Sequence, residues 1–137
     1  TMNRAAVLLD LGRPKEAGSL LRLARGYLEI LAEPDTLGLL QVNEGQWHME
    51  MGRWVQARKL WEEALAQLRQ HGSPNDLARS LKTIAGFLVA RGSVATGRAY
   101  LSEARGIAAS LGNVALETEL EGLLAHEVPP SIHKTST

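Results

Sequence analysis

Apolar residues recur at helical spacing along this chain, in segments that polar and turn-forming residues separate. The first clear stripe follows Pro14 and includes Leu21 and Ala24, and similar stripes follow Gly52, Pro74 and Gly92. The pattern predicts seven helices and no strand, over about residues 2–12, 14–31, 36–51, 54–71, 74–91, 94–111 and 114–127.

Two breaks between the predicted helices have clear turn chemistry. Glu33-Pro34-Asp35-Thr36 places capping residues after a proline, and we expect the next helix to begin there. In His71-Gly72-Ser73-Pro74, Gly72 suits a left-handed helix end, Ser73 an N-cap and Pro74 the first helical position. Asp76, three places after Ser73, has the spacing of a capping box with Asp in place of Glu.

A sequence repeat runs through the predicted helices. Gly12, Gly52 and Gly92 are separated by equal intervals (52−12 and 92−52), and at five, nine and twelve places after each glycine the residues are small, large apolar and small. These three sets are Ala17, Ala57 and Gly97; Leu21, Trp61 and Leu101; and Ala24, Ala64 and Ala104. A period of about 20–50 residues indicates stacked supersecondary units, which favours binding over catalysis.

The repeats resemble tetratricopeptide repeats (TPR), in which a turn glycine joins two helices of a hairpin. The second block matches best, with Gly45 in the first helix, Gly52 and Trp54 at the turn, and Ala57, Trp61 and Ala64 in the second helix. The resemblance implies an all-α right-handed superhelix, a solenoid of about seven helices in three hairpins plus a capping helix. We expect one repeat domain over 2–127, with repeats at about 2–33, 35–72 and 74–112, a cap at 114–127 and a tail at 128–137.

The period of 40 exceeds the family's usual 34, so the helices are longer, and Pro14, Val94 and Gly97 depart from the family pattern. This longer variety resembles repeats of bacterial signal-responsive transcriptional regulators and of scaffold proteins. The resemblance therefore implies a non-catalytic protein–protein interaction module, as part of a larger regulatory or scaffold protein. The absence of cysteine fits a reducing cytoplasm, which is the compartment we expect.

Composition narrows the classes of partner. Lys plus Arg and Asp plus Glu are 15 each, so the formal net charge is zero, which argues against nucleic acid and against an anionic membrane surface. Aromatic residues are only 4%, so alanine and leucine must fill most of the core. Cysteine is absent, which excludes disulfides and thiolate chemistry. No apolar run approaches the ~20 residues that span a bilayer.

No motif in the sequence indicates catalysis or a cofactor. The four histidines have no metal-ligand spacing, and we interpret them as core or solvated residues. We assign Trp54 and Trp61 to the core, whereas Trp47 is more open. We therefore predict no enzyme activity, no metal and no cofactor.

The resemblance implies that the first helix of each hairpin lines a concave groove for a peptide or a helix. The groove residues expected from the glycine register are Val42, Gln46, Met49 and Glu50 in the second block, and Arg79, Lys82, Gly86 and Val89 in the third. A chaperone-type carboxylate clamp is rejected, because only Asn43 and Arg79 match it while Met2 and Ala6 do not.

Two alternatives remain open. One is self-association as a homodimer through an open solenoid end, where Leu8, Leu9 and Leu11 would be exposed. The other is a sensory ligand-binding domain of a transcriptional regulator. The first repeat begins late in its own period, which predicts that the sequence is a piece of a larger protein.

Overall fold

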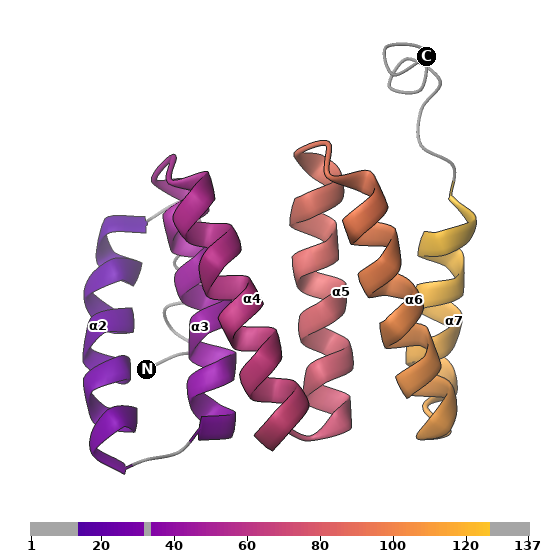
Figure 1. Cartoon of the computed structure of the whole chain (residues 1–137), viewed down its shortest axis with the longest axis horizontal. Coiled ribbons are helices and arrows are strands. Elements are labelled where there is room, and N and C mark those ends of the chain that lie inside the picture. Colours follow the sequence, from indigo (N-terminus) through magenta and orange to yellow (C-terminus); the bar gives the residue numbers. More distant parts are fainter. Residues whose placement is uncertain (1–13, 32–33, 127–137) are drawn as a thin grey trace. The chain divides into compact units, whose positions relative to one another are not determined.

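The computed structural model describes residues 14–31 and 34–126, and every regular element in these residues is an α-helix (Figure 1). This confirms the predicted all-α class. The predicted helix at 2–12, the first repeat glycine Gly12 and the tail at 128–137 lie outside the described residues. The helices are α2 (Pro14–Leu31), α3 (Pro34–Glu50), α4 (Trp54–His71), α5 (Pro74–Ala90), α6 (Val94–Ser110) and α7 (Val114–Ala125).

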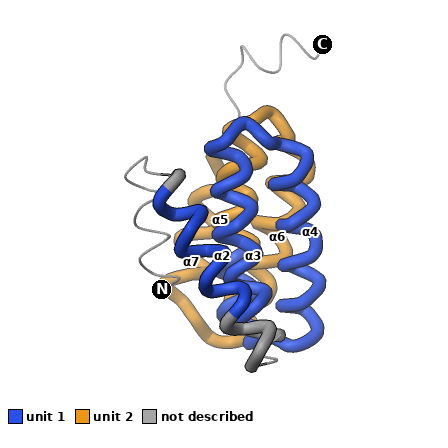
Figure 2. Tube along the Cα trace, turned by 90° about the vertical axis from the view of Figure 1, so that its left-hand side faces the viewer, with its two compact units in different colours: residues 1–80 blue, residues 81–137 orange. Residues whose placement is uncertain are grey.

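The chain divides into two compact units, residues 1–80 and residues 81–137 (Figure 2). In the first unit, α3 packs between α2 and α4. In the second, the C-terminal part of α5 contacts α6, and α6 packs against α7. No helix among the described residues is both long and apolar enough to cross a membrane.

The helix starts follow the same period as the glycines. The first residues of α3, α5 and α7 are Pro34, Pro74 and Val114, which are equally spaced along the chain (74−34 and 114−74). Proline suits this position because the first-turn N–H groups have no intrahelical partner. Helix α3 begins at Pro34. The sequence pattern predicts a later start, with Asp35 and Thr36 as the capping residues. Ser73 caps α5 as predicted, since its Oγ accepts a 3.1 Å hydrogen bond from the Asp76 backbone N–H.

Three turns share one geometry, with a glycine at positive φ after the helix end. At Gly52 (φ +79°), the Gly52 N–H donates to the Met49 carbonyl at 3.0 Å, and the Arg53 N–H donates to the His48 carbonyl at 2.7 Å. These two bonds define a Schellman motif, which satisfies carbonyls at the helix end. Equivalent pairs occur at Gly92 (φ +91°) and Gly112 (φ +68°), so the predicted turns at Gly52 and Gly92 are confirmed.

The prediction for Gly72 is wrong in its geometry. Its φ is −81° with ψ 165°, which is extended backbone rather than a left-handed helix end. Glycine is suited to this position for a steric reason, because a Cβ there would lie 2.8 Å from Leu68 Cδ2 and 2.9 Å from the Leu68 carbonyl oxygen. The helix break falls where it was predicted. Glycine is favoured at position 72 because a side chain there would collide with Leu68, and not because the backbone has a positive φ.

The small–large–small register forms the core of both units. In the first unit, a cluster of Ala17, Leu21, Ala24 and Leu40 joins α2 to α3. On α4, Ala57, Trp61 and Ala64 are at most 1% exposed, which confirms the core assignment of Trp61. Trp54 is only half-buried and meets Trp61 edge to face, with ring centroids 5.7 Å apart.

The same register forms the core of the second unit, where glycine takes the first small position on α6. Gly97 of α6 lies against α5, where a Cβ would be 2.6 Å from Val89 Cγ2 and 3.1 Å from the Ala85 carbonyl oxygen. On α6 and α7 the buried residues are Gly97, Leu101, Ala104, Ala108, Leu116 and Leu120. The Arg98 guanidinium donates to the Leu124 carbonyl at 2.8 Å and so fixes the C-terminal end of α7 to α6.

Candidate partner-binding surface

Helix α3 packs through two of its sides, and among the described residues a third side is partly exposed. One side faces α2, where Leu40 joins the apolar cluster and Glu44 pairs with Arg25. The second faces α4, where Gly38 and Gly45 lie against Leu68 and Trp61. At 100° per residue, the remaining side carries partly or fully exposed residues, which we call the outward stripe of α3: Thr36, Leu39, Asn43, Gln46 and Glu50.

The predicted groove residues of the second block divide between these sides. Gln46 is half-buried and Glu50 is exposed, and both belong to the outward stripe. Val42 and Met49 are each only 7% exposed. They follow Gly38 and Gly45 by four places, so they lie on the side of α3 that faces α4. Their side chains contribute to packing, and we leave them out of the candidate surface.

The residues predicted from the third block lie on α5 and also divide. Arg79 and Gly86 are exposed, one period after Leu39 and Gln46 of the outward stripe. Lys82 forms an ion pair with Glu119 of α7, with 2.9 Å between Nζ and Oε1. Val89 is half-buried against the Cα of Gly97. Arg79 and Gly86 are therefore the exposed residues of this predicted set, whereas Lys82 and Val89 are half-buried and contact α7 and α6.

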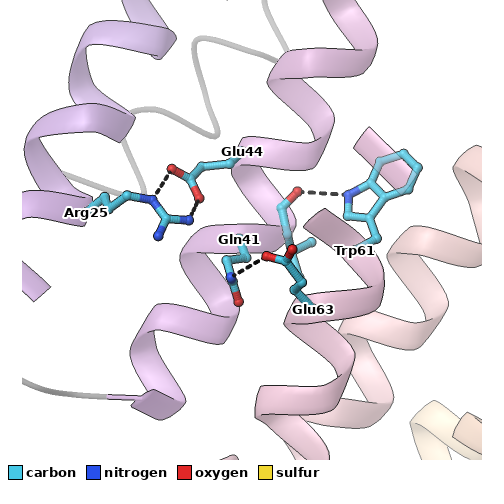
Figure 3. Close-up of polar contacts among 6 residues, drawn as sticks. Arg25, Gln41, Glu44, Trp61 and Glu63 are labelled. Atoms are coloured by element: carbon cyan, nitrogen blue, oxygen red, sulfur yellow. Dashed lines mark hydrogen bonds and ion pairs between the residues drawn. The ribbon is translucent and has the colours of Figure 1, made fainter. Parts of the chain in front are cut away.

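Polar contacts hold α3 in place behind the outward stripe (Figure 3). The Glu44 carboxylate accepts two hydrogen bonds from the guanidinium of Arg25 on α2. The Arg25 Nε donates to Glu44 Oε2 at 2.7 Å, and the Arg25 Nη2 donates to Glu44 Oε1. The amide of Gln41, only 6% exposed, donates to Glu63 of α4 at 3.4 Å. A paired, partly buried carboxylate of this kind fixes the rotation of α3 between its neighbours. The outward stripe is therefore presented on a helix with a defined orientation.

The C-terminal end of α3 carries an aromatic and cationic cluster. The Arg53 guanidinium lies over the Trp47 ring at 5.3 Å from its centroid, within the range of a cation–π interaction. His48 meets the same ring edge-on, at 4.7 Å between centroids. Burial lowers the pKa of His48 below its usual value, the Arg53 charge lowers it further, and Glu44 opposes both effects. Burial and the Arg53 charge thus both favour the neutral form of His48.

Three buried polar atoms on α3 find no hydrogen-bond partner within residues 14–31 and 34–126. They are Gln41 Oε1, Trp47 Nε1 and His48 Nδ1. Buried groups without partners usually cost about 1–3 kcal/mol each. Over the same residues, no three His, Asp or Glu side chains gather as metal ligands.

Sequence reasoning missed the role of Trp47. This ring packs against the apolar cluster of α2 and α3, and a Cβ at Gly18 would lie 2.7 Å from its Nε1. One feature of the sequence indicates that a bulky side chain packs on α2, because Gly18 stands between the buried residues Ala17 and Leu21. Nothing in the sequence pairs that glycine with Trp47, which belongs to the following helix.

No family model, curated protein or solved structure matches the chain.

Proposed function

We propose that this chain is a non-catalytic protein–protein interaction module with a TPR-like solenoid arrangement. The outward stripe of α3 binds an extended peptide or an amphipathic helix, and Arg79, at the corresponding register position of α5, adds a cationic contact. In this proposal the module is the sensory or scaffold part of a larger regulatory protein, which the resemblance of the longer repeats suggests.

The observation that supports the proposal is the partly exposed side of α3, which faces neither α2 nor α4. α3 is held from both flanks, by α2 and by α4, yet the side chains of its outward stripe stay half-buried or, at Glu50, exposed. Its composition is that of a recognition surface, because Leu39 offers apolar area, Asn43 and Gln46 offer amides, and Glu50 offers a charge. Amides can both donate to and accept from the backbone of an extended peptide.

The first test selects ligands for the purified chain from a displayed library of random peptides. The peptides are then titrated into the chain labelled with ¹⁵N, and their affinity is measured for a variant with Asn43→Ala and Gln46→Ala. We expect amide shifts along the outward stripe of α3 and a loss of affinity of about tenfold or more in the variant, which corresponds to about 1.4 kcal/mol.

The matched control replaces Gln56 and Gln70 of α4 by alanine, since both are exposed polar residues on a helix of similar length. This control variant should bind the selected peptides like the unmodified chain. If the peptides bind the Asn43→Ala, Gln46→Ala variant with unchanged affinity, the outward stripe of α3 is not the binding surface.

A further inference from the structure

Glu44 has a basic side chain near it on each of two helices. The guanidinium of Arg25 on α2 donates two hydrogen bonds to the Glu44 carboxylate, and this ion pair joins α2 to α3. His48 follows Glu44 by four places on α3, so the two side chains lie on the same side of that helix. An acidic residue four places before a basic one is the favourable order for an ion pair within a helix. A protonated His48 would therefore be a second partner for Glu44.

The packing around His48 does not suit a protonated ring. Its Nδ1 is buried and has no hydrogen-bond partner within residues 14–31 and 34–126. A protonated imidazole donates from both of its nitrogens, and a buried donor without an acceptor is costly. Uptake of a proton by His48 therefore requires either that the ring moves or that an acceptor comes to it. The Glu44 carboxylate, one helical turn away on the same side, is an acceptor of the right charge.

The charges around His48 come from α2, α3, α4 and the turn between α3 and α4. After burial, the Arg53 charge is the next cause that lowers the His48 pKa, and Glu44 raises it. The Arg53 N–H donates to the His48 carbonyl at 2.7 Å, so the turn keeps this like charge beside the ring. From α2, Arg25 occupies the Glu44 carboxylate, and on α4 Glu63 accepts a hydrogen bond from another α3 side chain. The nearest negative charge is thus already engaged by α2.

Trp47 connects His48 to the contact between α2 and α3. The two rings meet edge to face, with 4.7 Å between their centroids. The Trp47 ring packs against the apolar cluster that joins α2 to α3, and its Nε1 would lie 2.7 Å from a Cβ at Gly18 of α2. Because closely packed side chains transmit a displacement, a movement of the His48 ring would disturb the position of the indole on α2.

We propose that His48 makes the contact between α2 and α3 sensitive to pH. When His48 takes up a proton, Glu44 exchanges Arg25 for His48 as its ion-pair partner, and α2 loosens from α3 while the other helices stay folded. The step consists of a proton uptake and an exchange of ion-pair partners, with no covalent change. It does not depend on peptide binding at the outward stripe of α3, so either proposal can fail its test without the other.

The direction of the pH effect follows from the difference between the two forms of the contact. In the packed form the pKa of His48 is lowered from 6.5 by burial and by Arg53. In the loosened form the ring is solvated and Glu44 is free to pair with it, and both changes favour the charged imidazole. The loosened form therefore binds the proton more tightly, so acidification below about pH 6.5 shifts the equilibrium towards it. At higher pH both forms have a neutral His48, and the packed form is favoured.

Amide hydrogen exchange tests the local loosening of α2. Protection factors, which correct for the pH dependence of intrinsic exchange, are measured by NMR on the unmodified chain at about pH 7.5 and about pH 5.5, on either side of the usual histidine range. We expect the protection of α2 amides to fall about threefold or more at the lower pH, with no such loss in α6. Glutamine does not titrate in this range, so a His48→Gln variant should protect α2 equally at both pH values.

A titration of the His48 ring tests the exchange of partners. The Cε1–H resonance of His48 is followed by NMR as a function of pH. In Arg25→Gln, Glu44 loses its cationic partner on α2, so the titration midpoint of His48 should move to higher pH. In Glu44→Gln the midpoint should move to lower pH, because the charge that favours the imidazolium is gone. The matched control is Arg22→Gln, which removes an exposed guanidinium from the same helix and should leave the midpoint unchanged.

Three results would overturn the proposal. The first is α2 protection that stays the same at both pH values in the unmodified chain, or that falls together with α6, which would indicate unfolding of the whole chain. The second is a loss of α2 protection in His48→Gln equal to that of the unmodified chain. The third is a His48 midpoint that does not move in Arg25→Gln. The first and third results require no substitution of His48, so they decide the matter even if His48→Gln does not fold.

Discussion

The indole ring of Trp61 lies against the backbone of α3 at Gly45, so closely that a Cβ at residue 45 would overlap it. The ring is 1% exposed, and its Nε1 donates a 3.1 Å hydrogen bond to the Val42 carbonyl. The glycine thus makes room for the largest side chain of the core and brings its N–H to an acceptor. This contact fixes the spacing of α3 and α4.

Gly45→Ala should destabilise the chain, although alanine is the better helix former. Overpacking against Trp61 should cost about 1–3 kcal/mol in the free energy of unfolding, measured by urea denaturation. Gly86→Ala is the control, because a Cβ at Gly86 meets open space and should stabilise the helix by up to about 1 kcal/mol. If both variants are stabilised, Trp61 does not pack against Gly45.

Trp61→Leu should partly rescue Gly45→Ala. Alanine and leucine stand together at the equivalent positions 85 and 101, so the pair is compatible with this hairpin geometry. In a double-mutant cycle we expect a favourable coupling energy of about 1 kcal/mol or more. A coupling energy near zero would show that the two side chains do not share the same space.

The Arg25–Glu44 pair should stabilise the packing of α2 on α3. The Glu44 side chain is 12% exposed and that of Arg25 is 30% exposed, so this pair is better shielded than an ordinary surface pair. A cycle of Arg25→Gln and Glu44→Gln should give a coupling energy of about 1 kcal/mol by urea denaturation. Lys59→Gln, an exposed change on α4, should shift stability by less than about 0.5 kcal/mol.

Stability should decrease on acidification because of His48. Its pKa in the folded chain is lowered from 6.5, so between that value and the folded pKa the unfolded chain binds more protons. The free energy of unfolding should therefore fall as the pH drops below about 6.5, and the contribution should level off below the folded pKa. His48→Gln should flatten this dependence when the free energy of unfolding is measured by urea denaturation at several pH values, and an unchanged dependence would contradict the assignment to His48.

Gly92 should resist substitution for a reason of backbone conformation. Its φ is +91°, where a side chain is strained even in open space. Gly92→Ala should cost about 1–2 kcal/mol, and Gly92→Asn should cost less, because asparagine visits positive φ more readily. Thermal unfolding of the two variants checks the order, and equal melting temperatures would contradict it.

The repeated positions made the helices and two of their turns predictable from the sequence. Gly52 and Gly92, together with the small–large–small residues of α4 and α6, marked the turns and the buried sides of the helices. The end at Gly72 could not be predicted, because its backbone geometry depends on the fit against Leu68 rather than on a local preference. Glycine is favoured in both situations, and the sequence does not distinguish them.

The candidate surface was harder to predict because α3 is packed on two sides. Its apolar residues form no single stripe, so Val42 and Met49 could not be separated from accessible residues such as Gln46. The contacts of Gly38 and Gly45 with α4 decide which side is buried. Such contacts join residues of different helices, as Gly45 and Trp61 do, and helical periodicity alone carries no information about them.

The shared geometry of the turns at Gly52 and Gly92 has a consequence for how such a chain can change its length. Deletion of the segment 54–93 would connect Arg53 directly to Val94, and both sides of the new junction already belong to the same kind of turn. Duplication of the same segment would leave every turn equally intact. Gain or loss of one whole repeat length therefore preserves the turn chemistry, while a new neighbour pair such as Gly45 facing Leu101 would leave space unfilled.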